Sequence, residues 1–361
     1  MRVLLIQLKQ IGDVLITSSM CGNIKKNYPN AKVDILVYEH CAGVIENNPY
    51  IDNIITLTKK ERKNPFLYLK KILSIKKNRY DYTIDLLADM ASGIITFLVK
   101  SEYRIANRSK KFRNNFFYNI RLENPYLNTV KRRNHLLLGI NQDIKLENNV
   151  KIYLDNNEIQ NLKKRMEENG VKFNKKIAAI GINSRRHYKI WKMEYFITLI
   201  DYLIDKYDIQ VILYSNDAER DYALLAKSKI KNQNNVFTDI YTKNIRELAA
   251  LLKNCDIFIG NEGGPRHIAE SVGIPTFVMA SITHIDDAWK LDEKTFGTKH
   301  IIIKPILSKI MNEKEFSQYR KKLLKNRDQE RRIFDELKPE IVIEKLEEML
   351  LQSKIIKRNG D

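Results

Sequence analysis

One stretch of this chain combines residue types that bind anions through the backbone. Residues 255–277 read CDIFIGNEGGPRHIAESVGIPTF, where a short apolar run breaks at Gly260 and a Gly-Gly pair precedes Pro265. The run is typical of a buried parallel strand, glycines let a backbone approach a ligand closely, and proline suits the first position of a helix. Such a helix start presents N–H groups without intrahelical partners and the positive end of the dipole. We therefore expect a diphosphate above this turn; a plain strand-to-helix connection is the alternative.

The elements that must position this turn alternate along the whole chain. Expected strands cover residues 2–8, 33–37, 54–57, 82–86, 177–182, 209–214, 257–259 and 274–279, with a short one near 236. Helical patterns cover residues 14–27, 64–77, 90–99, 156–169, 193–207, 218–229, 245–253 and 265–273, and the charged tail 313–353. Strands alternating with helices predict βαβ units and parallel sheets. The predicted fold class is α/β, with two Rossmann-like, doubly wound parallel-sheet domains facing each other across a ligand-binding cleft.

The length of 361 residues suggests two domains. We place them at 1–170 and 171–361, with the boundary close to Gly170, and expect the tail to pack outside the second domain or to cross back to the first. Residues 107–150 are polar, basic and hard to assign.

The composition and the apolar runs of the sequence limit the class of protein that this chain can be. The N-terminal apolar run is too short for a signal peptide, and no run approaches the roughly 20 residues of a membrane span. Three cysteines without metal spacing fit a reducing compartment. The six histidines are dispersed, and the pair Asp286-Asp287 reads equally as a solvated loop or as two ligands. We expect a cytoplasmic protein without a metal ion.

The net charge of +19 is concentrated in the first half of the chain. Residues 59–79 hold nine Lys and Arg against Glu61, and residues 100–133 hold ten against Glu102 and Glu123, so each window carries +8. Nucleic acid, an anionic membrane surface or an acidic acceptor molecule would each explain this excess. A generally lysine-rich surface is the fourth explanation.

Three separated segments resemble one enzyme family. They are the Gly12-Asp13 turn in residues 11–17, the pattern Asn183-Ser184-Arg185 followed by Lys189-Ile190-Trp191, and the Gly-rich stretch above, which is similar to Asn-Asp-Ser/Thr-Gly-x-x-His. Together they resemble the ADP-heptose:lipopolysaccharide heptosyltransferases, glycosyltransferase family 9, over most of residues 1–300.

The resemblance implies an inverting, metal-independent glycosyltransferase with the GT-B fold. A nucleotide-diphosphate sugar, ADP-linked, would be a co-substrate in the C-terminal domain, with no separate cofactor. The N-terminal domain would hold an anionic glycolipid such as the lipopolysaccharide core, with peripheral contact to the inner face of the cytoplasmic membrane and no nucleic-acid partner.

The resemblance also assigns roles to residues. Asp13 would be the general base that takes the acceptor hydroxyl's proton; a helix N-cap is the alternative. Lys189 would stabilise the leaving diphosphate; an exposed loop lysine is the alternative. The expected donor-binding residues are Gly12, Ser184, Lys189, Glu262, Gly263, Gly264, Pro265, Arg266 and His267.

The Gly-rich stretch departs from the family pattern at two positions. Glu262 stands where Asp is usual, and Gly263 replaces Ser or Thr, which puts the identity of the donor sugar in question. Arg266 would reinforce phosphate binding or be solvated, and His267 would contact the donor or pack in its helix. The loop 281–284 matches the family poorly.

Two other functions fit parts of the sequence. A nicotinamide-dependent oxidoreductase would share the fold, but residues 7–12 hold no G-x-G-x-x-G. A basic nucleic-acid-binding protein would rest on charge alone, because no recognition module is visible.

Overall fold

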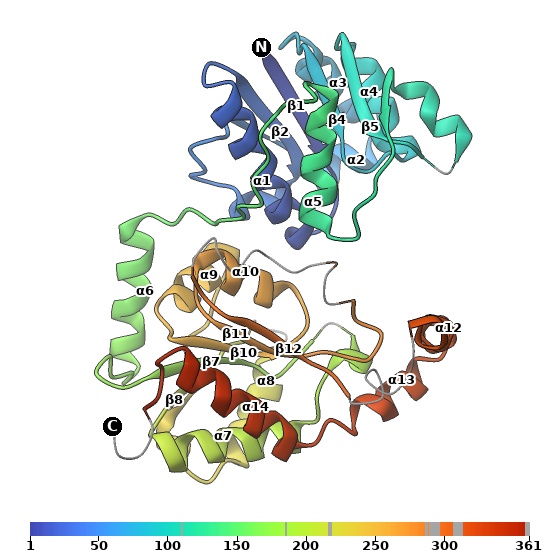
Figure 1. The fold of residues 1–361 in the computed structure, drawn as a ribbon. Helices are drawn as coiled ribbons and strands as arrows, with labels where there is room; N and C mark the ends of the chain where they lie inside the picture. Colours follow the sequence, from blue (N-terminus) through green and yellow to red (C-terminus); the bar gives the residue numbers. More distant parts are fainter. Residues whose placement is uncertain are drawn as a thin grey trace. The chain divides into compact units, whose positions relative to one another are not determined.

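The chain forms two α/β units in a computed structural model, which describes residues 1–109, 111–184, 186–215, 219–285, 288, 297–305 and 313–357 (Figure 1). Within these residues, unit 1 comprises 1–153 with Ala288, and unit 2 comprises 154–285 and 297–357. The expected α/β class with two doubly wound parallel sheets is confirmed.

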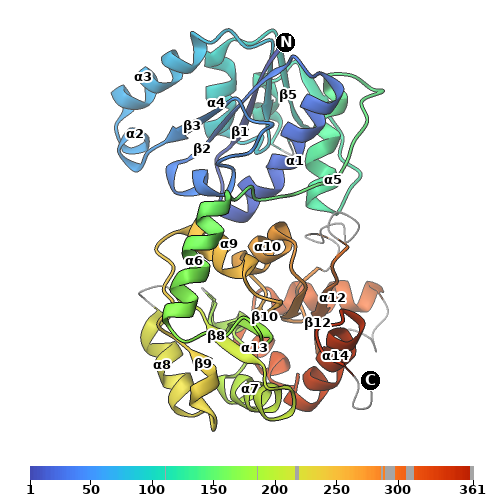
Figure 2. The same ribbon diagram turned by 90° about the vertical axis from the view of Figure 1, so that its left-hand side faces the viewer.

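Unit 1 is built on a six-stranded parallel sheet with the order β3-β2-β1-β4-β5-β6. Its strands are β1 (Arg2–Gln7), β2 (Lys32–Tyr38), β3 (Asn53–Leu57), β4 (Tyr82–Asp85), β5 (Tyr103–Asn107) and β6 (Ile120–Leu122). Its helices are α1 (Ile11–Asn27), α2 (Lys59–Lys63), α3 (Pro65–Lys76), α4 (Met90–Val99) and α5 (Thr129–Asn134), with 3₁₀ helices η1 (Glu39–Val44), η2 (Phe112–Phe117) and η3 (His135–Gly139). Figure 2 shows α1 and α5 on one side of the sheet, with α2 and α3 on the other.

The central position of β1 in the sheet of unit 1 explains the apolar run in its sequence. Five of the six residues of β1 are buried, because the strand pairs with β2 on one edge and β4 on the other while helices cover both faces. Such a strand needs a continuous apolar run, which is why it could be predicted from the sequence. The short strands β5 and β6 lie at the other end of the sheet and were not predicted.

Unit 2 repeats the arrangement with the sheet order β12-β11-β10-β7-β8-β9. Its strands are β7 (Ile177–Gly181), β8 (Gln210–Leu213), β9 (Val236–Phe237), β10 (Ile257–Asn261), β11 (Thr276–Met279) and β12 (His300–Ile303). Its helices are α6 (Asn156–Glu168), α7 (Met193–Tyr207), α8 (Arg220–Ser228), α9 (Ile245–Lys253), α10 (Gly264–Val272), α12 (Glu313–Leu323), α13 (Arg327–Phe334) and α14 (Pro339–Gln352), with 3₁₀ helices η4 (His187–Lys189) and η6 (Gln233–Asn235).

Helix α6 belongs to unit 2, whereas a division after residue 170 puts it in the first domain. Two ion pairs hold α6 on α9: Arg246 Nε lies 2.5 Å from a Glu158 oxygen, and Arg165 Nη2 lies 3.1 Å from Glu247 Oε2. Leu162 and Met166 of α6 are also buried, so the helix is held by apolar packing as well as by ion pairs. The C-terminal helices α12 to α14 also belong to unit 2, where α14 contributes to the same core cluster as α7.

Both sheets have a point where the strand order reverses, between β1 and β4 in unit 1 and between β7 and β10 in unit 2. Doubly wound sheets bind ligands at such points, outside the carboxyl ends of the strands. The loop after β1 leads to Asp13, and the loops after β7 and β10 carry Lys189 and Glu262. The predicted site residues of each unit therefore lie at its reversal point.

No helix in the part of the chain that the structure describes is both long and apolar enough to cross a membrane.

Candidate active site

The turn between β10 and α10 leaves the start of the helix uncovered. A Cβ at Gly264 would meet no atom within 4 Å, and one at Gly263 would come no closer than 3.9 Å to another residue. Gly263 has an extended backbone with φ of 168°, and no side chain caps α10. Neither backbone strain nor crowding requires these glycines, so their missing side chains keep the N–H groups at the helix start accessible to an anion.

Lys189 and Glu262 form an ion pair next to this turn. The Glu262 side chain is 11% exposed, and His284 Nδ1 lies 4.0 Å from its Oε1. Burial would raise the pKa of Glu262, but the charges of Lys189, His284 and His267 outweigh it and lower that pKa. Glu262 is therefore an ionised carboxylate at neutral pH, with the Lys189 ammonium held against it.

Asn261 fixes the segment that carries Lys189. Its Oδ1 accepts a hydrogen bond from the Trp191 backbone N–H at 2.8 Å, and its Nδ2 donates to the carbonyls of Gly181 and Asn183 at 3.4 Å. The Trp191 indole is fully buried and donates to the Leu337 carbonyl at 2.6 Å. Both the backbone N–H and the indole N–H of Trp191 are thus hydrogen-bonded, which restricts the positions that Lys189, two residues earlier, can reach.

Ser184 lies in the loop after β7 and is half-buried, with its backbone N–H bound to Asn183 Oδ1 at 2.8 Å. Its neighbour Arg185 lies outside the described residues.

Arg266 is buried and paired within α10. Its Nε donates to Glu270 Oε1 at 2.6 Å, and His267 Nδ1 lies 3.5 Å from Glu270 Oε2. The side chain of Arg266 is 1% exposed, so the alternative of a solvated arginine is wrong. Burial would raise the pKa of Glu270, but Arg266 and His267 outweigh it and lower the value to about 2. This cluster fixes α10 internally, one turn after Gly263 and Gly264, and Pro265 occupies the first turn of the helix.

The loop after β11 is held by a buried carboxylate that sequence analysis missed. Glu330 of α13 is fully buried and accepts hydrogen bonds from Ser281 Oγ at 2.7 Å and from Thr283 Oγ1, while Arg327 pairs with its second oxygen. These contacts position His284 beside Glu262. No local motif marks Glu330, which looks like any other acid of a charged tail. The pair Asp286-Asp287 lies outside the described residues.

In unit 1, Asp13 lies in the first turn of α1 with Gly12 before it. Gln10 is the N-cap residue of this helix and no side chain caps it, so the N-cap alternative for Asp13 is wrong. Asp13 Oδ1 instead accepts a hydrogen bond from Arg133 Nη2 of α5 at 2.6 Å. The Asp13 side chain is 19% exposed and that of Arg133 only 8%. One carboxylate oxygen is thus fixed by a buried guanidinium while the group keeps access to solvent.

Arg133 remains charged at neutral pH. Burial lowers its pKa to about 10, and the carboxylate of Asp13 acts against this effect. Sequence analysis gave no role to Arg133, because it lies in the segment that was hardest to assign and far along the chain from Asp13.

A cavity of about 560 Å³ opens at the carboxyl ends of the unit 1 strands. Three cations line it, Lys9 after β1, Arg108 after β5 and Arg132 of α5, and Arg108 Nε pairs with Glu123 at 2.8 Å. The rest of its lining is formed by Leu86, Leu87, Ala88, Asn107, Ser109, Asn124 and Tyr126. Its volume falls in the range typical of small-molecule sites. Because Arg132 precedes Arg133, and Lys9 precedes α1, the cavity adjoins the segments that hold Asp13.

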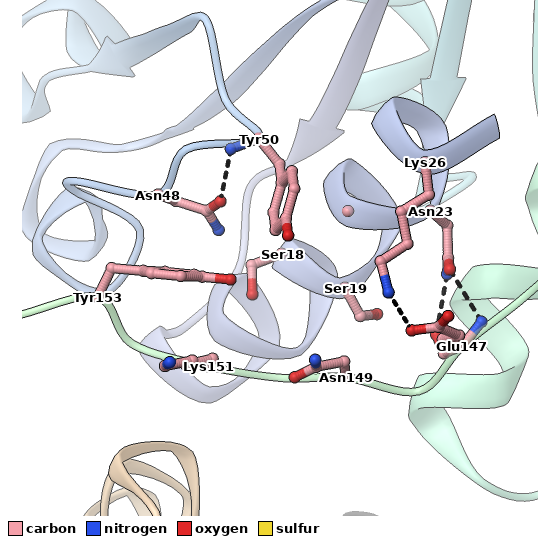
Figure 3. Close-up of a pocket in the computed structure, with 11 residues that line it drawn as sticks. Ser18, Ser19, Asn23, Lys26, Asn48, Tyr50, Glu147, Asn149, Lys151 and Tyr153 are labelled. Atoms are coloured by element: carbon pink, nitrogen blue, oxygen red, sulfur yellow. Dashed lines mark hydrogen bonds and ion pairs between the residues drawn. The ribbon is translucent and has the colours of Figure 1, made fainter. Parts of the chain in front are cut away.

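A second, much smaller hollow in unit 1 lies along α1 (Figure 3). Its volume of about 20 Å³ has room for roughly one water molecule. There Asn23 exchanges two hydrogen bonds with the backbone of Glu147, at 2.9 and 2.8 Å, and Lys26 pairs with the Glu147 carboxylate. These polar contacts attach Glu147 to α1, and the hollow is too small for a sugar.

The chain is similar in sequence to known lipopolysaccharide heptosyltransferases. The chain is 26% identical to lipopolysaccharide heptosyltransferase 1 of Campylobacter coli over 330 residues, covering 83% of this chain and 92% of that protein. It is 25% identical to lipopolysaccharide heptosyltransferase 3 of Escherichia coli, covering 75% and 81%.

Solved structures share the fold. A glycosyltransferase family 9 protein from Veillonella parvula superposes with a TM-score of 0.80 at 16% identity, covering 97% of both chains. The E. coli ADP-heptose lipopolysaccharide heptosyltransferase II gives a TM-score of 0.72 at 15% identity, covering 98% and 100%. These are GT-B enzymes, and the predicted GT-B architecture is confirmed.

The family model for glycosyltransferase family 9 (heptosyltransferase) matches residues 69–279, more than half of the chain. The resemblance drawn from three short segments is therefore confirmed, and this protein belongs to glycosyltransferase family 9, the heptosyltransferases.

Proposed function

We propose that this glycosyltransferase moves a heptose, or a closely related sugar, from an ADP-linked donor to an acidic acceptor of the lipopolysaccharide core on the cytoplasmic leaflet. The observation that carries the proposal is the Asp13 carboxylate in the first turn of α1, fixed by Arg133. The same unit has a cavity lined by Lys9, Arg108 and Arg132, and the chain neighbour of Arg132 is Arg133. The relatives named above are lipopolysaccharide heptosyltransferases, and an E. coli heptosyltransferase of the same fold was solved with ADP.

On the donor side, the uncovered start of α10 supports diphosphate binding. Its N–H groups and the positive end of the helix dipole attract negative charge. Lys189 adds a full positive charge next to this turn. A leaving nucleoside diphosphate gains negative charge as its bond to the sugar breaks, so both features would stabilise it.

On the acceptor side, the cavity of unit 1 suits an anionic sugar. Lys9 and Arg132 provide the charge, since Arg108 is paired with Glu123, and the asparagine and tyrosine side chains can hydrogen-bond to hydroxyl groups. Bound there, an acceptor would have its reacting hydroxyl close to the segments that hold Asp13.

The reaction is a single displacement. Asp13 takes the proton of the acceptor hydroxyl as the hydroxyl oxygen forms a bond to the anomeric carbon. The bond between that carbon and the diphosphate oxygen breaks, and the electron pair leaves with the nucleoside diphosphate. The attack comes from the face opposite to the leaving group, so the anomeric configuration is inverted.

The Glu262 side chain gives this site a feature of its own. It reaches the Lys189 ammonium, so the positive charge of this lysine is paired within the protein itself. An arriving diphosphate would compete with Glu262 for Lys189, and the carboxylate released from the pair would be free to accept hydrogen bonds from sugar hydroxyls. Donor selectivity would then depend on the length of this acidic side chain.

A thermal-shift screen against nucleotide-diphosphate sugars tests the proposal, because a ligand that binds the native state stabilises it by mass action. We expect ADP-heptose to raise the melting temperature more than UDP- or GDP-linked sugars, and transfer to a heptose-deficient lipopolysaccharide core to follow. Stabilisation by none of these donors would contradict the proposal.

A further inference from the structure

Helix α3 exposes an apolar stripe that its own fold does not use. Phe66, Leu69 and Leu73 are 75%, 46% and 47% exposed. Their spacing of three and four residues puts them on one side of the helix. The side that packs on the sheet is formed by Ile72 and Ile75, which are buried. The stripe is therefore additional to the apolar surface that the fold of unit 1 requires.

Helix α4 exposes a second stripe of the same kind. Met90, Ile94 and Phe97 are 38%, 40% and 41% exposed, again at helical spacing. Phe116 of η2 is 74% exposed, and its ring centroid lies 5.8 Å from that of Phe97. We call these seven side chains on α3, α4 and η2 the apolar face: Phe66, Leu69, Leu73, Met90, Ile94, Phe97 and Phe116.

Both helices belong to one layer of unit 1. Ile72 and Ile75 of α3 lie in the same core cluster as Ile95 and Val99 of α4, together with β1 residues such as Leu4. In both ribbon views α3 and α4 lie next to each other over the sheet (Figures 1 and 2). The apolar face thus lies on the outside of a single layer.

Exposed apolar side chains are unusually concentrated there. Seven of the sixteen large exposed hydrophobic residues in the described part of the chain belong to these three elements. Scattered exposed hydrophobic residues need no explanation, but a gathered set is typical of an interaction site.

The charge around the apolar face is strongly positive. Residues 59–79, which contain α2 and α3, hold nine Lys and Arg against one acid. Exposed cations of this window and of the ends of α4 and η2 are Lys59, Lys60, Arg62, Lys63, Lys70, Lys77, Arg79, Lys100, Lys111 and Arg113. They outnumber the exposed acids at the ends of α4, which are Asp89 and Glu102. Apolar side chains surrounded by lysines are the signature of a surface that lies in the interface of an anionic bilayer.

We propose that the layer of α3, α4 and η2 docks on the surface of an anionic lipid bilayer. The apolar face enters the boundary between headgroups and acyl chains, and the surrounding lysines contact lipid phosphates. Nucleic acid fits less well, because Leu69, Leu73, Met90 and Ile94 offer no ring for base stacking. A protein partner also fits less well, since lysine is depleted in protein interfaces relative to the rest of the protein surface. The inference does not depend on the sugar-transfer reaction.

Sedimentation of the full-length protein with lipid vesicles tests this proposal. We expect binding to vesicles that contain phosphatidylglycerol, weakened by salt, and little binding to phosphatidylcholine alone. The triple variant Phe66→Ser, Leu73→Ser, Phe97→Ser should bind at least about tenfold more weakly, because burial of such side chains drives insertion. Since the three residues are exposed, its melting temperature should stay near that of the wild type.

The matched control is Leu224→Ser with Leu225→Ser on α8 of unit 2, residues that are 40% and 49% exposed. It should bind vesicles as the wild type does. Transfer to a lipid-free acceptor should be unchanged in both variants, which separates docking from catalysis. The proposal is overturned if the wild type ignores anionic vesicles, if the triple variant binds like the wild type, if the control loses as much binding, or if an oligonucleotide binds this surface while vesicles do not.

Discussion

Arg133 Nη2 lies 2.6 Å from Asp13 Oδ1, and this contact joins α5 to the first turn of α1. The guanidinium is buried, while the carboxylate keeps part of its surface in solvent. A base must be held in a fixed orientation to act on a hydroxyl in the transition state, and a buried, charged hydrogen-bond donor can hold it. Arg133 is thus a positioning residue for Asp13.

Replacing Arg133 should reduce turnover far more than binding. We expect Arg133→Ala to lower kcat by roughly 100-fold, since misplacement of a catalytic group by about 1 Å costs that much. The KM for the donor should stay near the wild-type value. Arg133→Lys should recover only part of the activity, because lysine lacks the planar fork. Steady-state kinetics with both substrates give the comparison.

The neighbouring Arg132 is the matched control. It is exposed and lines the cavity of unit 1. Arg132→Ala should raise the acceptor KM by about tenfold, as expected for one lost charge-assisted hydrogen bond, with kcat less affected. Identical kinetic effects of the two substitutions would remove the distinction between a positioning residue and a substrate contact.

The Lys189–Glu262 pair predicts opposite effects of two substitutions on ADP affinity. Lys189→Gln should weaken ADP binding by roughly 10- to 100-fold, because a charge-assisted contact to phosphate is lost. Glu262→Gln should tighten ADP binding, because Lys189 no longer has a competing carboxylate and ADP lacks the transferable sugar that Glu262 is proposed to contact. Isothermal titration measures both. Equal affinity in the wild type and Lys189→Gln would refute the role of this lysine.

Donor selectivity should follow the length of the residue at position 262. Glu262→Asp shortens the side chain by one methylene, so the carboxylate can no longer hold Lys189 and contact the sugar in the same way. We expect the ratio of kcat/KM for two ADP-linked sugars to change by at least about tenfold, in keeping with the cost of an unpaired polar group in a site. An unchanged ratio would mean that this carboxylate does not read the sugar.

The buried pair in α10 predicts how stability changes with pH. Glu270 has a pKa of about 2 in the folded protein against an ordinary value of 4.5. Because the folded value is the lower one, the pair's contribution is complete above about pH 5 and is lost as the pH falls towards 2. The contribution is on the order of 3 kcal/mol. Denaturant unfolding between pH 7 and pH 3 should show this loss in the wild type.

Variants of this pair separate its charge from its packing. Glu270→Gln alone should cost about 3–5 kcal/mol at pH 7, because Arg266 is left charged and buried. The double variant Arg266→Met with Glu270→Met should lower the free energy of unfolding at pH 7 by less than Glu270→Gln does, because no charge is left buried without a partner. Its free energy of unfolding should also fall less between pH 7 and pH 3 than that of the wild type. A double variant as unstable as Glu270→Gln, with the same pH dependence as the wild type, would contradict this account.

The sequence predicted the fold well where strands are buried on both faces. β1 and β10 are continuous apolar runs, and their neighbours follow the same rule. The strands β5, β6 and β12 were missed, because they are short and carry polar or exposed residues. The unit to which α6 belongs depends on contacts with a distant helix, since α6 is paired with α9 through Arg165 and Arg246.

The residues of the candidate site could likewise be predicted from the sequence only in part. Gly263, Gly264 and Lys189 lie in short motifs whose spacing is readable along the chain. Arg133 and Glu330 are brought to the site by packing between distant elements, so no local spacing indicates them. The sequence therefore predicts the residues proposed to contact substrates better than those that hold them in place.

The role of Asp13 as general base is tested most directly by single-turnover transfer with Asp13→Asn. The asparagine keeps the size of the side chain and can still accept the hydrogen bond of Arg133, but it takes up no proton. We predict a fall in the transfer rate of roughly 10²- to 10⁴-fold, with the affinity for ADP within about twofold of the wild type. Transfer at close to the wild-type rate would contradict the proposed mechanism.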